Sequence, residues 1–376
     1  MRRGLGAVVP ALALLPVVAS CAIAGAEPWE VGVTVDELPP APFAPREDHG
    51  LVWSGEELLV WGGHAAGQHD SFADGAAYSP RTGAWRTLAD VDLEPRTRHT
   101  TVMVGERMLV WGGFTPTYAD DEDAHLARDG ALYDPEADSW EPVADAPQAR
   151  SQARGVVVGE HVVVGGGDRG RGTDRHDFLV YAPEEDAWDT VALPLDGEPG
   201  AAVYDLTAVG DTVVAVGSTG REIFTATFRV GDEAAAVRVV PEAGGTAAET
   251  GLAAGPGGTA LLVLCDGETV TRYEIGADGR AEPVDEADHS AFRPAVSVRT
   301  ALLLSGDMAA VDGTTLLATA PGEFSLWDTA GGRTHREWVR ETSDYCGPLV
   351  PVAEDTLLGW GGRGCETVGV SVGVDV

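Results

Sequence analysis

The chain contains no lysine and no asparagine in its 376 residues. Without lysine it cannot form a Schiff base through a lysine side chain or use a lysine general base, and without asparagine it cannot carry an N-linked glycan. Positive charge is scarce: 25 arginines stand against 60 acidic residues, which gives a formal net charge of −35. Nucleic acid requires a basic surface, so this composition argues against a nucleic-acid partner.

Long apolar runs are absent beyond the first twenty residues. Arg2 and Arg3 precede an apolar stretch over residues 5–19, the layout of a signal peptide and too short for a comfortable membrane span. The segment ending in Ser20-Cys21 resembles the lipobox of a bacterial lipoprotein. That resemblance implies a signal peptide over residues 1–20, a lipidated Cys21, a short linker over 21–28 and attachment to the extracytoplasmic face of the cell membrane. Ordinary secretion and a retained anchor are the alternatives.

One phrase occurs three times at intervals of about 50 residues. An apolar run closed by two glycines is followed by Tyr-x-Pro and by a tryptophan seven positions after the tyrosine. The apolar runs end at Gly62-Gly63, Gly112-Gly113 and Gly165-Gly166, and the aromatic pairs are Tyr78 with Trp85, Tyr133 with Trp140, and Tyr181 with Trp188. This period is typical of propeller repeats. The apolar runs suit buried strands, and a glycine pair allows a close backbone approach and a turn.

These copies resemble Kelch repeats. The resemblance implies an all-β propeller with four-stranded blades, in which strand a lines the central channel, strand b ends in Gly-Gly, strand c carries the tyrosine and strand d the tryptophan. Four further apolar segments continue the series of b strands, at residues 212–217, 259–264, 314–318 and 356–362. We therefore expect a single seven-bladed propeller over residues 29–376, with six blades as the alternative.

The two ends of the chain are expected to close the ring. Val368, Val370, Val372, Val374 and Val376 alternate with small or polar residues, the period of a β-strand. No sequence follows them to supply the outer strand of the last blade. Residues 29–36 match the outer strand of the other blades, and Pro39, Pro40, Pro45 and Arg46 after them match the exit loop, so pairing of the two ends would leave no open sheet edge.

Three cysteines remain besides Cys21, and export permits disulfides. Cys346 precedes the innermost strand of the last blade and Cys365 follows its second strand. These positions are neighbours at one end of an antiparallel hairpin, so we predict a disulfide between them. Cys265 is expected to stay unpaired as a small apolar residue at a strand end.

Long polar connections from strand b to strand c single out one face of the disc as the binding face. Three arginines enter strand a on that face, as Pro45-Arg46 with His49, Pro95-Arg96 with His99, and Arg150 with Ala153 in the histidine position. They either ring the channel mouth and bind carboxylates, or brace the blades by hydrogen bonds. The third long connection adds Arg171 and His176. The predicted ligand-binding residues are Arg46, His49, Arg96, His99, Arg150, Arg171 and His176.

Two other groups have a weaker claim to chemistry. The acidic run Asp120–Asp123 with His125 offers carboxylate oxygens of the kind that bind Ca²⁺. It lacks the EF-hand pattern, so we interpret it as a solvated loop. His64, His69 and Asp70 could form a metal or acid–base triad, although spacing alone does not bring them together. No catalytic motif is assembled, so we predict no cofactor, no metal and no catalytic residue.

The leading interpretation is a monomeric, lipid-anchored binding or scaffolding module for a protein, peptide or glycan ligand. One alternative is a secreted enzyme acting on carbohydrate or peptide, because Kelch-like propellers include galactose-oxidase-like copper enzymes. Another is a structural component of an envelope assembly. With a lipid on Cys21, we expect the face with the short turns to lie toward the membrane and the long connections to point outward.

Overall fold

The computed structural model describes most of the chain between Gly32 and Asp375. The described ranges are residues 32–65, 71–115, 126–167, 177–195, 198, 201–241, 243, 249–255, 257–266, 269–284, 309–311, 315–320, 323–328, 333–338, 348–353, 355–361 and 369–375. All regular elements in these ranges are β-strands. No helix in these ranges has the length and apolar character needed to cross a bilayer.

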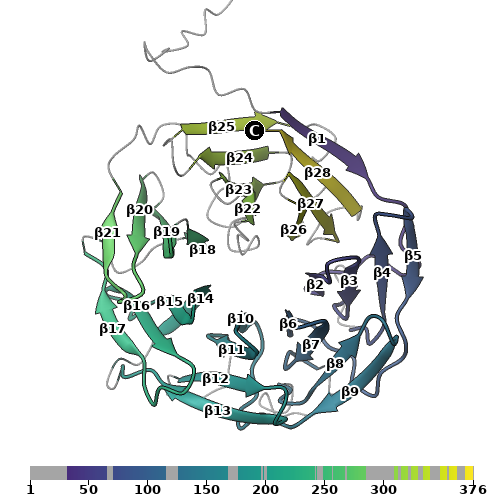
Figure 1. Cartoon of the computed structure of the whole chain (residues 1–376), viewed down its shortest axis with the longest axis horizontal. Coiled ribbons are helices and arrows are strands. Elements are labelled where there is room, and N and C mark those ends of the chain that lie inside the picture. The colour runs from purple at the N-terminus through teal and green to yellow at the C-terminus, as the bar shows by residue number, and fades with distance from the viewer. Residues whose placement is uncertain are drawn as a thin grey trace, which may run out of the picture.

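The strands form seven four-stranded antiparallel sheets arranged around a central opening (Figure 1). Blades 1 to 3 comprise β2 (Gly50–Trp53), β3 (Leu58–Trp61), β4 (Gly75–Ser79) and β5 (Ala84–Thr87); β6 (Thr100–Val104), β7 (Arg107–Trp111), β8 (Gly130–Asp134) and β9 (Ser139–Val143); and β10 (Arg154–Val158), β11 (His161–Gly165), β12 (Asp177–Ala182) and β13 (Ala187–Ala192). The expected all-β propeller is confirmed.

Blades 4 to 7 continue around the ring in chain order. They comprise β14 (Ala202–Val209), β15 (Thr212–Ser218), β16 (Ile223–Arg229) and β17 (Ala236–Val239); β18 (Glu249–Gly255), β19 (Thr259–Asp266), β20 (Thr269–Ile275) and β21 (Ala281–Pro283); β22 (Ala309–Val311), β23 (Thr315–Ala320), β24 (Glu323–Asp328) and β25 (Arg333–Trp338); and β26 (Leu349–Ala353), β27 (Thr356–Trp360), β28 (Gly369–Asp375) and β1 (Gly32–Glu37). Seven sheets agree with the leading expectation rather than with the six-bladed alternative.

The first and last strands complete one sheet. β1 lies on the outer side of β28, and Val33 stands opposite Val374 in an antiparallel register. The innermost strand of that sheet is β26, so the N-terminal strand supplies the outer strand that the C-terminal segment lacks. The predicted closure by the two chain ends is confirmed.

The repeated phrase marks the interior of each blade. All four residues of β3 are buried, as expected for an apolar second strand between two neighbours. Tyr78 stands directly opposite Trp85 in the β4–β5 register, and blades 2 and 3 repeat this pairing with Tyr133–Trp140 and Tyr181–Trp188. Apolar clusters fill the space between adjacent blades; one of them joins Trp111 of blade 2 to Val164 of blade 3.

The tryptophans also connect blades. The Trp140 indole Nε1 donates to the Ala89 carbonyl of blade 1 at 2.9 Å, and Trp188 Nε1 donates to the Ala144 carbonyl of blade 2 at 2.8 Å. A tryptophan in this position thus packs on the tyrosine of its own blade while satisfying its N–H on the preceding blade. The repeat is therefore a device for joining sheets as well as for forming them.

Candidate functional site

The three predicted arginines lie inside the blades that they precede. Arg46 has a fully buried side chain, and its Nη1 donates to the Gly62 carbonyl at 3.1 Å and to Asp74 Oδ1 at 2.8 Å. The guanidinium also lies between the rings of Phe43 and Phe72, at 4.2 and 4.3 Å from their centroids. Burial lowers the pKa of Arg46, and the bond to Asp74 opposes that shift. The side chain thus joins the end of β3 to the start of β4.

Blades 2 and 3 repeat this arrangement. Arg96 donates to the Gly112 carbonyl at 3.2 Å and to both carboxylate oxygens of Asp129 at 2.9 and 3.1 Å. Arg150 Nη2 lies 2.6 Å from Asp177 Oδ1. The backbones of Arg96 and Arg150 contact the previous blade, since the Gly63 amide donates to the Arg96 carbonyl at 2.9 Å and the Gly113 amide donates to the Arg150 carbonyl at 2.7 Å. The arginines therefore connect strands and blades, and their contact with a ligand stays a prediction.

His49 and His99 fill the seams between blades. The ring of His49 packs edge-on against Trp360 of blade 7, with centroids 5.4 Å apart, and its Nε2 lies 2.9 Å from the Trp360 carbonyl oxygen. His99 packs against Trp61 of blade 1 at 5.2 Å. Burial, followed by the charge of the neighbouring arginine, lowers the pKa of His49 to about 4 and that of His99 to about 3. Both rings are neutral at pH 7.

Glycine is required where these histidines insert. Gly62 has φ of +68°, and a Cβ atom added there would lie 2.6 Å from Cε1 of His99. Such an approach is far inside van der Waals contact, so a side chain would displace the histidine from the seam. The Gly-Gly pair of one blade and the histidine of the next blade are therefore parts of one interlocking contact.

The channel mouth is built by the residues between each arginine and histidine position. Asp48, Arg98 and Gln152 occupy equivalent places in blades 1, 2 and 3, and all three have left-handed backbone, with φ of 52°, 57° and 57°. They are linked in succession: the Arg98 amide donates to the Asp48 carbonyl at 2.9 Å, and the Gln152 amide donates to the Arg98 carbonyl at 2.8 Å. Each lies two positions before an innermost strand, β2, β6 or β10, and these strands border the central opening (Figure 1).

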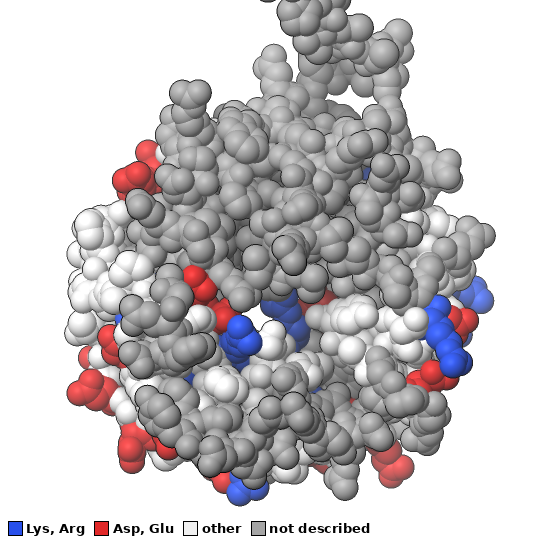
Figure 2. Space-filling model, turned by 180° about the vertical axis from the view of Figure 1, so that it is seen from behind, with Lys and Arg blue, Asp and Glu red and all other residues white. Residues whose placement is uncertain are grey.

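Charges of both signs meet at this border. Arg98 Nε donates to Asp48 Oδ2 at 2.9 Å, and both side chains are partly exposed. The His64 ring lies beside them, with Nδ1 at 3.2 Å from Thr97 Oγ1 and Nε2 at 3.8 Å from Glu47 Oε2. Figure 2 shows arginine and acidic side chains next to each other around the central opening. We call Glu47, Asp48, His64, Thr97 and Arg98 the mouth cluster.

Repeat analysis missed most of the mouth cluster. It recorded the recurring residues Arg46, Arg96 and Arg150, and the structure places these inside the blades. The residues that lie at the channel mouth are instead the variable ones between the arginine and histidine positions of each repeat. The available signal was the change from aspartate to arginine to glutamine at one position of an otherwise constant motif.

Several other predictions concern residues outside the described ranges. These residues are Cys21, His69, Asp70, Asp120–Asp123, His125, Arg171, His176, Cys346 and Cys365. Their predicted roles in lipidation, disulfide bonding and ligand contact stay predictions. Cys265 belongs to β19, the second strand of blade 5. Among the described residues, no three His, Cys, Asp or Glu side chains are grouped closely enough to hold a metal ion.

The chain was compared with known proteins. The family model described as "KLHDC2/KLHL20/DRC7 Kelch-repeats domain" matches residues 27–218, just over half of the chain. No curated protein sequence matches. Among solved structures, the protein YjhT aligns with a TM-score of 0.52 at 15% identity, covering 90% of this chain and 99% of that one. A fungal alcohol oxidase of the AA5 family in complex with copper aligns with a TM-score of 0.58 at 12% identity, covering 92% and 76%. Both likenesses are of fold.

Proposed function

The chain belongs to the Kelch-repeat family, and we propose that it is a binding or scaffolding module that holds its ligand at the mouth of the central channel. The main support is that Asp48, Arg98 and Gln152, at equivalent positions of three consecutive blades, all have a left-handed backbone conformation. Non-glycine residues in this conformation store strain, and surrounding contacts must hold them there. Three such residues at equivalent points of one rim form a fixed surface whose chemistry changes from blade to blade.

The mouth cluster suits a polar ligand that carries both hydrogen-bond donors and acceptors. Blade 1 contributes the carboxylates of Glu47 and Asp48, while blade 2 contributes the guanidinium of Arg98. Asp48 and Arg98 are partly shielded from solvent, so their hydrogen bonds to a ligand contribute more than contacts at an exposed surface would. A peptide or a glycan offers groups of this kind. We propose that the buried Arg46, Arg96 and Arg150 do not contact the ligand themselves. They hold in place the backbone segments before the innermost strands, and these segments contain residues of the channel mouth.

The likeness to a copper alcohol oxidase extends to the fold. A copper site needs convergent ligands, and within the described ranges no three His, Cys, Asp or Glu side chains converge. The side chains at the channel mouth instead form ion pairs and hydrogen bonds with one another. These features favour binding over oxidation as the function of the described surface.

We also propose that Cys21 carries a lipid and that the mouth faces away from the membrane. β1 leads into the segment that reaches Glu47 and then β2, so β1 ends on the side of the mouth and begins on the opposite side. Eleven positions separate Cys21 from Gly32, a reach of roughly 36–40 Å when fully extended. The lipid would therefore hold the short-turn face toward the bilayer. Cysteine labelling on intact cells tests this orientation: a cysteine replacing Asp121 should react readily, and one replacing Glu106 should be protected.

The binding proposal is tested with the mature chain on peptide and glycan arrays. The variant Asp48→Ala/Arg98→Ala removes both charged side chains of the mouth pair and should weaken binding of any captured ligand by at least about tenfold. The matched control is Arg107→Ala/Glu141→Ala, which removes an ion pair of the same 2.9 Å length, formed by Arg107 in the β6–β7 hairpin and Glu141 in β9. Equal loss in both variants, or no capture of any peptide or glycan, would contradict the proposal.

A further inference from the structure

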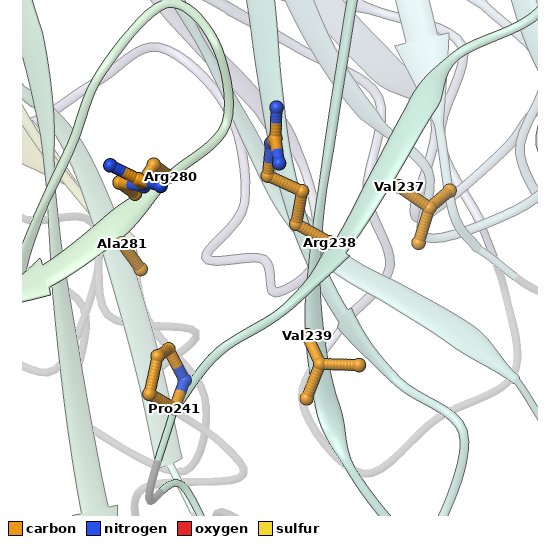
Figure 3. Close-up of a pocket in the computed structure, with 6 residues that line it drawn as sticks. All are labelled: Val237, Arg238, Val239, Pro241, Arg280 and Ala281. Atoms are coloured by element: carbon orange, nitrogen blue, oxygen red, sulfur yellow. The ribbon is translucent and has the colours of Figure 1, made fainter.

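A second hollow lies on the outer rim of the propeller, between blades 4 and 5. Its volume is about 370 Å³, and it is lined by Val237, Arg238, Val239, Pro241, Arg280 and Ala281 (Figure 3). We call these six residues the rim groove. β17 and β21 are the outermost strands of their sheets, so the rim groove is on the outside of the ring and shares no residue with the mouth cluster.

The two arginines of the rim groove lack carboxylate partners among the described residues. Arg238 Nε donates to the Asp278 carbonyl oxygen at 2.7 Å, and no described carboxylate lies within 4.0 Å of either guanidinium. Eight other arginines in the described ranges are paired with Asp or Glu, namely Arg46, Arg86, Arg96, Arg98, Arg107, Arg128, Arg150 and Arg229. In a chain of net charge −35, the rim groove is thus lined by two cations, one from blade 4 and one from blade 5.

An apolar wall accompanies these cations. Val239 is 53% exposed, one of the largest exposures of a bulky apolar residue in the described ranges, and Pro241 follows it along the groove. Figure 3 shows the arginine side chains toward one end of the groove and Val239 with Pro241 toward the other. An anionic head and an apolar body therefore have separate places in one hollow.

We propose that the rim groove binds a carboxylate-bearing ligand with an apolar body. The guanidinium is planar and presents several N–H donors that match a carboxylate, and Arg238 and Arg280 both line this hollow. The aliphatic part of the ligand packs on Val239, Pro241 and Ala281. Because the arginines come from different sheets, a bound carboxylate also connects blade 4 to blade 5. This site is independent of the function proposed for the channel mouth.

Both arginines are exposed to solvent, so each contributes a modest share of the binding and salt weakens it. We expect a dissociation constant on the order of 1 mM for a minimal ligand. The probe is 4-methylpentanoate. Its binding to the mature chain is measured by ligand-observed NMR titration at low ionic strength. Replacing either Arg238 or Arg280 with Gln should weaken binding by about two- to fivefold, and replacing both should weaken it more than either change alone.

Arg221→Gln is the matched control, because Arg221 is an exposed arginine of blade 4 that forms no ion pair with a carboxylate in the described ranges and lies outside the groove. Binding by this variant should equal that of the unchanged chain. Equal losses in all variants would show attraction to positive charge in general and would overturn the proposal. Thermal unfolding of each variant shows that the fold is retained, since an exposed arginine contributes little to it.

Three further probes sharpen the result. The isosteric 4-methylpentanamide and the short acetate should both bind more weakly than 4-methylpentanoate. Equal binding of the amide would overturn the role of the carboxylate, and equal binding of acetate would overturn the role of the apolar wall. N-acetyl-leucinate separates the two sources of such a group: tighter binding than 4-methylpentanoate identifies a peptide end, and weaker binding identifies a free acid.

Discussion

The ring of His99 in blade 2 packs edge-on against Trp61 of blade 1, with centroids 5.2 Å apart and planes at 77°. His49 and Trp360 form the same contact where blade 1 meets blade 7. A titratable ring thus fills two of the seams that hold the ring of blades together, one of them next to the sheet completed by the chain ends.

The free energy of unfolding should therefore fall with acidification through these histidines. Their folded pKa values of about 4 and about 3 lie below the ordinary 6.5, so the unfolded chain binds protons first as the pH falls. Their contribution to stability is present above pH 6.5 and is lost progressively toward pH 4 and pH 3. At pH 5 the loss reaches up to about 2 kcal/mol per histidine. Urea unfolding at pH 7 and pH 5 measures it.

The double variant His49→Gln/His99→Gln is the reference for that experiment. It should have a lower stability at pH 7 but a smaller loss between pH 7 and pH 5 than the unchanged chain. All other titrating groups are common to both proteins, so their effects cancel in the comparison. An equal loss in the two proteins would refute the assignment of the pH dependence to these seams.

The three buried arginines should differ in their contribution to stability. Asp177, the partner of Arg150, has a side chain only 12% exposed, whereas Asp74, the partner of Arg46, is 58% exposed. Arg150→Met leaves a carboxylate in a poorly hydrated place and should cost about 3 kcal/mol. Arg46→Met leaves a carboxylate that water can reach and should cost about 1–2 kcal/mol. Chemical denaturation measures both losses. The control is Arg128→Gln, which breaks the exposed ion pair between Arg128 and Asp145 and should change the free energy of unfolding by less than about 1 kcal/mol.

Asp138 should be one of the stabilising residues of the blade 1–2 junction. Its Oδ1 accepts hydrogen bonds from the Tyr133 hydroxyl at 2.6 Å and from the Ala89 amide of blade 1 at 3.0 Å, and these bonds lower its pKa. Its φ of 47° is unfavourable for alanine. Asp138→Ala should therefore reduce the free energy of unfolding by about 2 kcal/mol.

Two variants separate the causes of that loss. Asp138→Gly removes the hydrogen bonds but tolerates the left-handed backbone, so it should cost less than alanine; blade 1 naturally has Gly83 in this place, with φ of 64°. Glu136→Ala in the same turn should be nearly neutral. If alanine and glycine were equally destabilising, the backbone conformation would contribute nothing.

Removal of β1 should destabilise the whole propeller. A chain starting at Leu38 leaves the outer edge of β28 without a partner, and such edges promote self-association. We expect its thermal midpoint to fall by more than about 5 °C and oligomers to appear in light scattering. A chain starting at Gly32 retains the strand and is the control. Unchanged stability of the shorter chain would contradict the role of β1 in closure.

Much of the architecture could be predicted because each blade repeats the same local pattern. Alternation of valines after Val368 predicts a strand whichever blade contains it, and the spacing from Tyr78 to Trp85 reflects a tight turn between adjacent strands. The site could be predicted less well. Repetition identifies residues that every blade needs, such as Arg46 and His49, and binding depends on residues such as Asp48 and Arg98 that differ between blades. The rim groove was not foreseen, because β17 and the start of β21 are joined by no sequence motif.

The pairing of Val33 with Val374 also sets an order of events. The partners are 341 positions apart in sequence, so the ring cannot close until the segment that contains Val374 has been synthesised. Blades 1 to 6 can form earlier, since each of their strands pairs with a near neighbour along the chain. Closure is then the late and slow step, because a contact of such long sequence separation forms only after extensive chain ordering. Until it occurs, the edge of β28 is open to wrong partners, and the time spent in that state governs the yield of native protein.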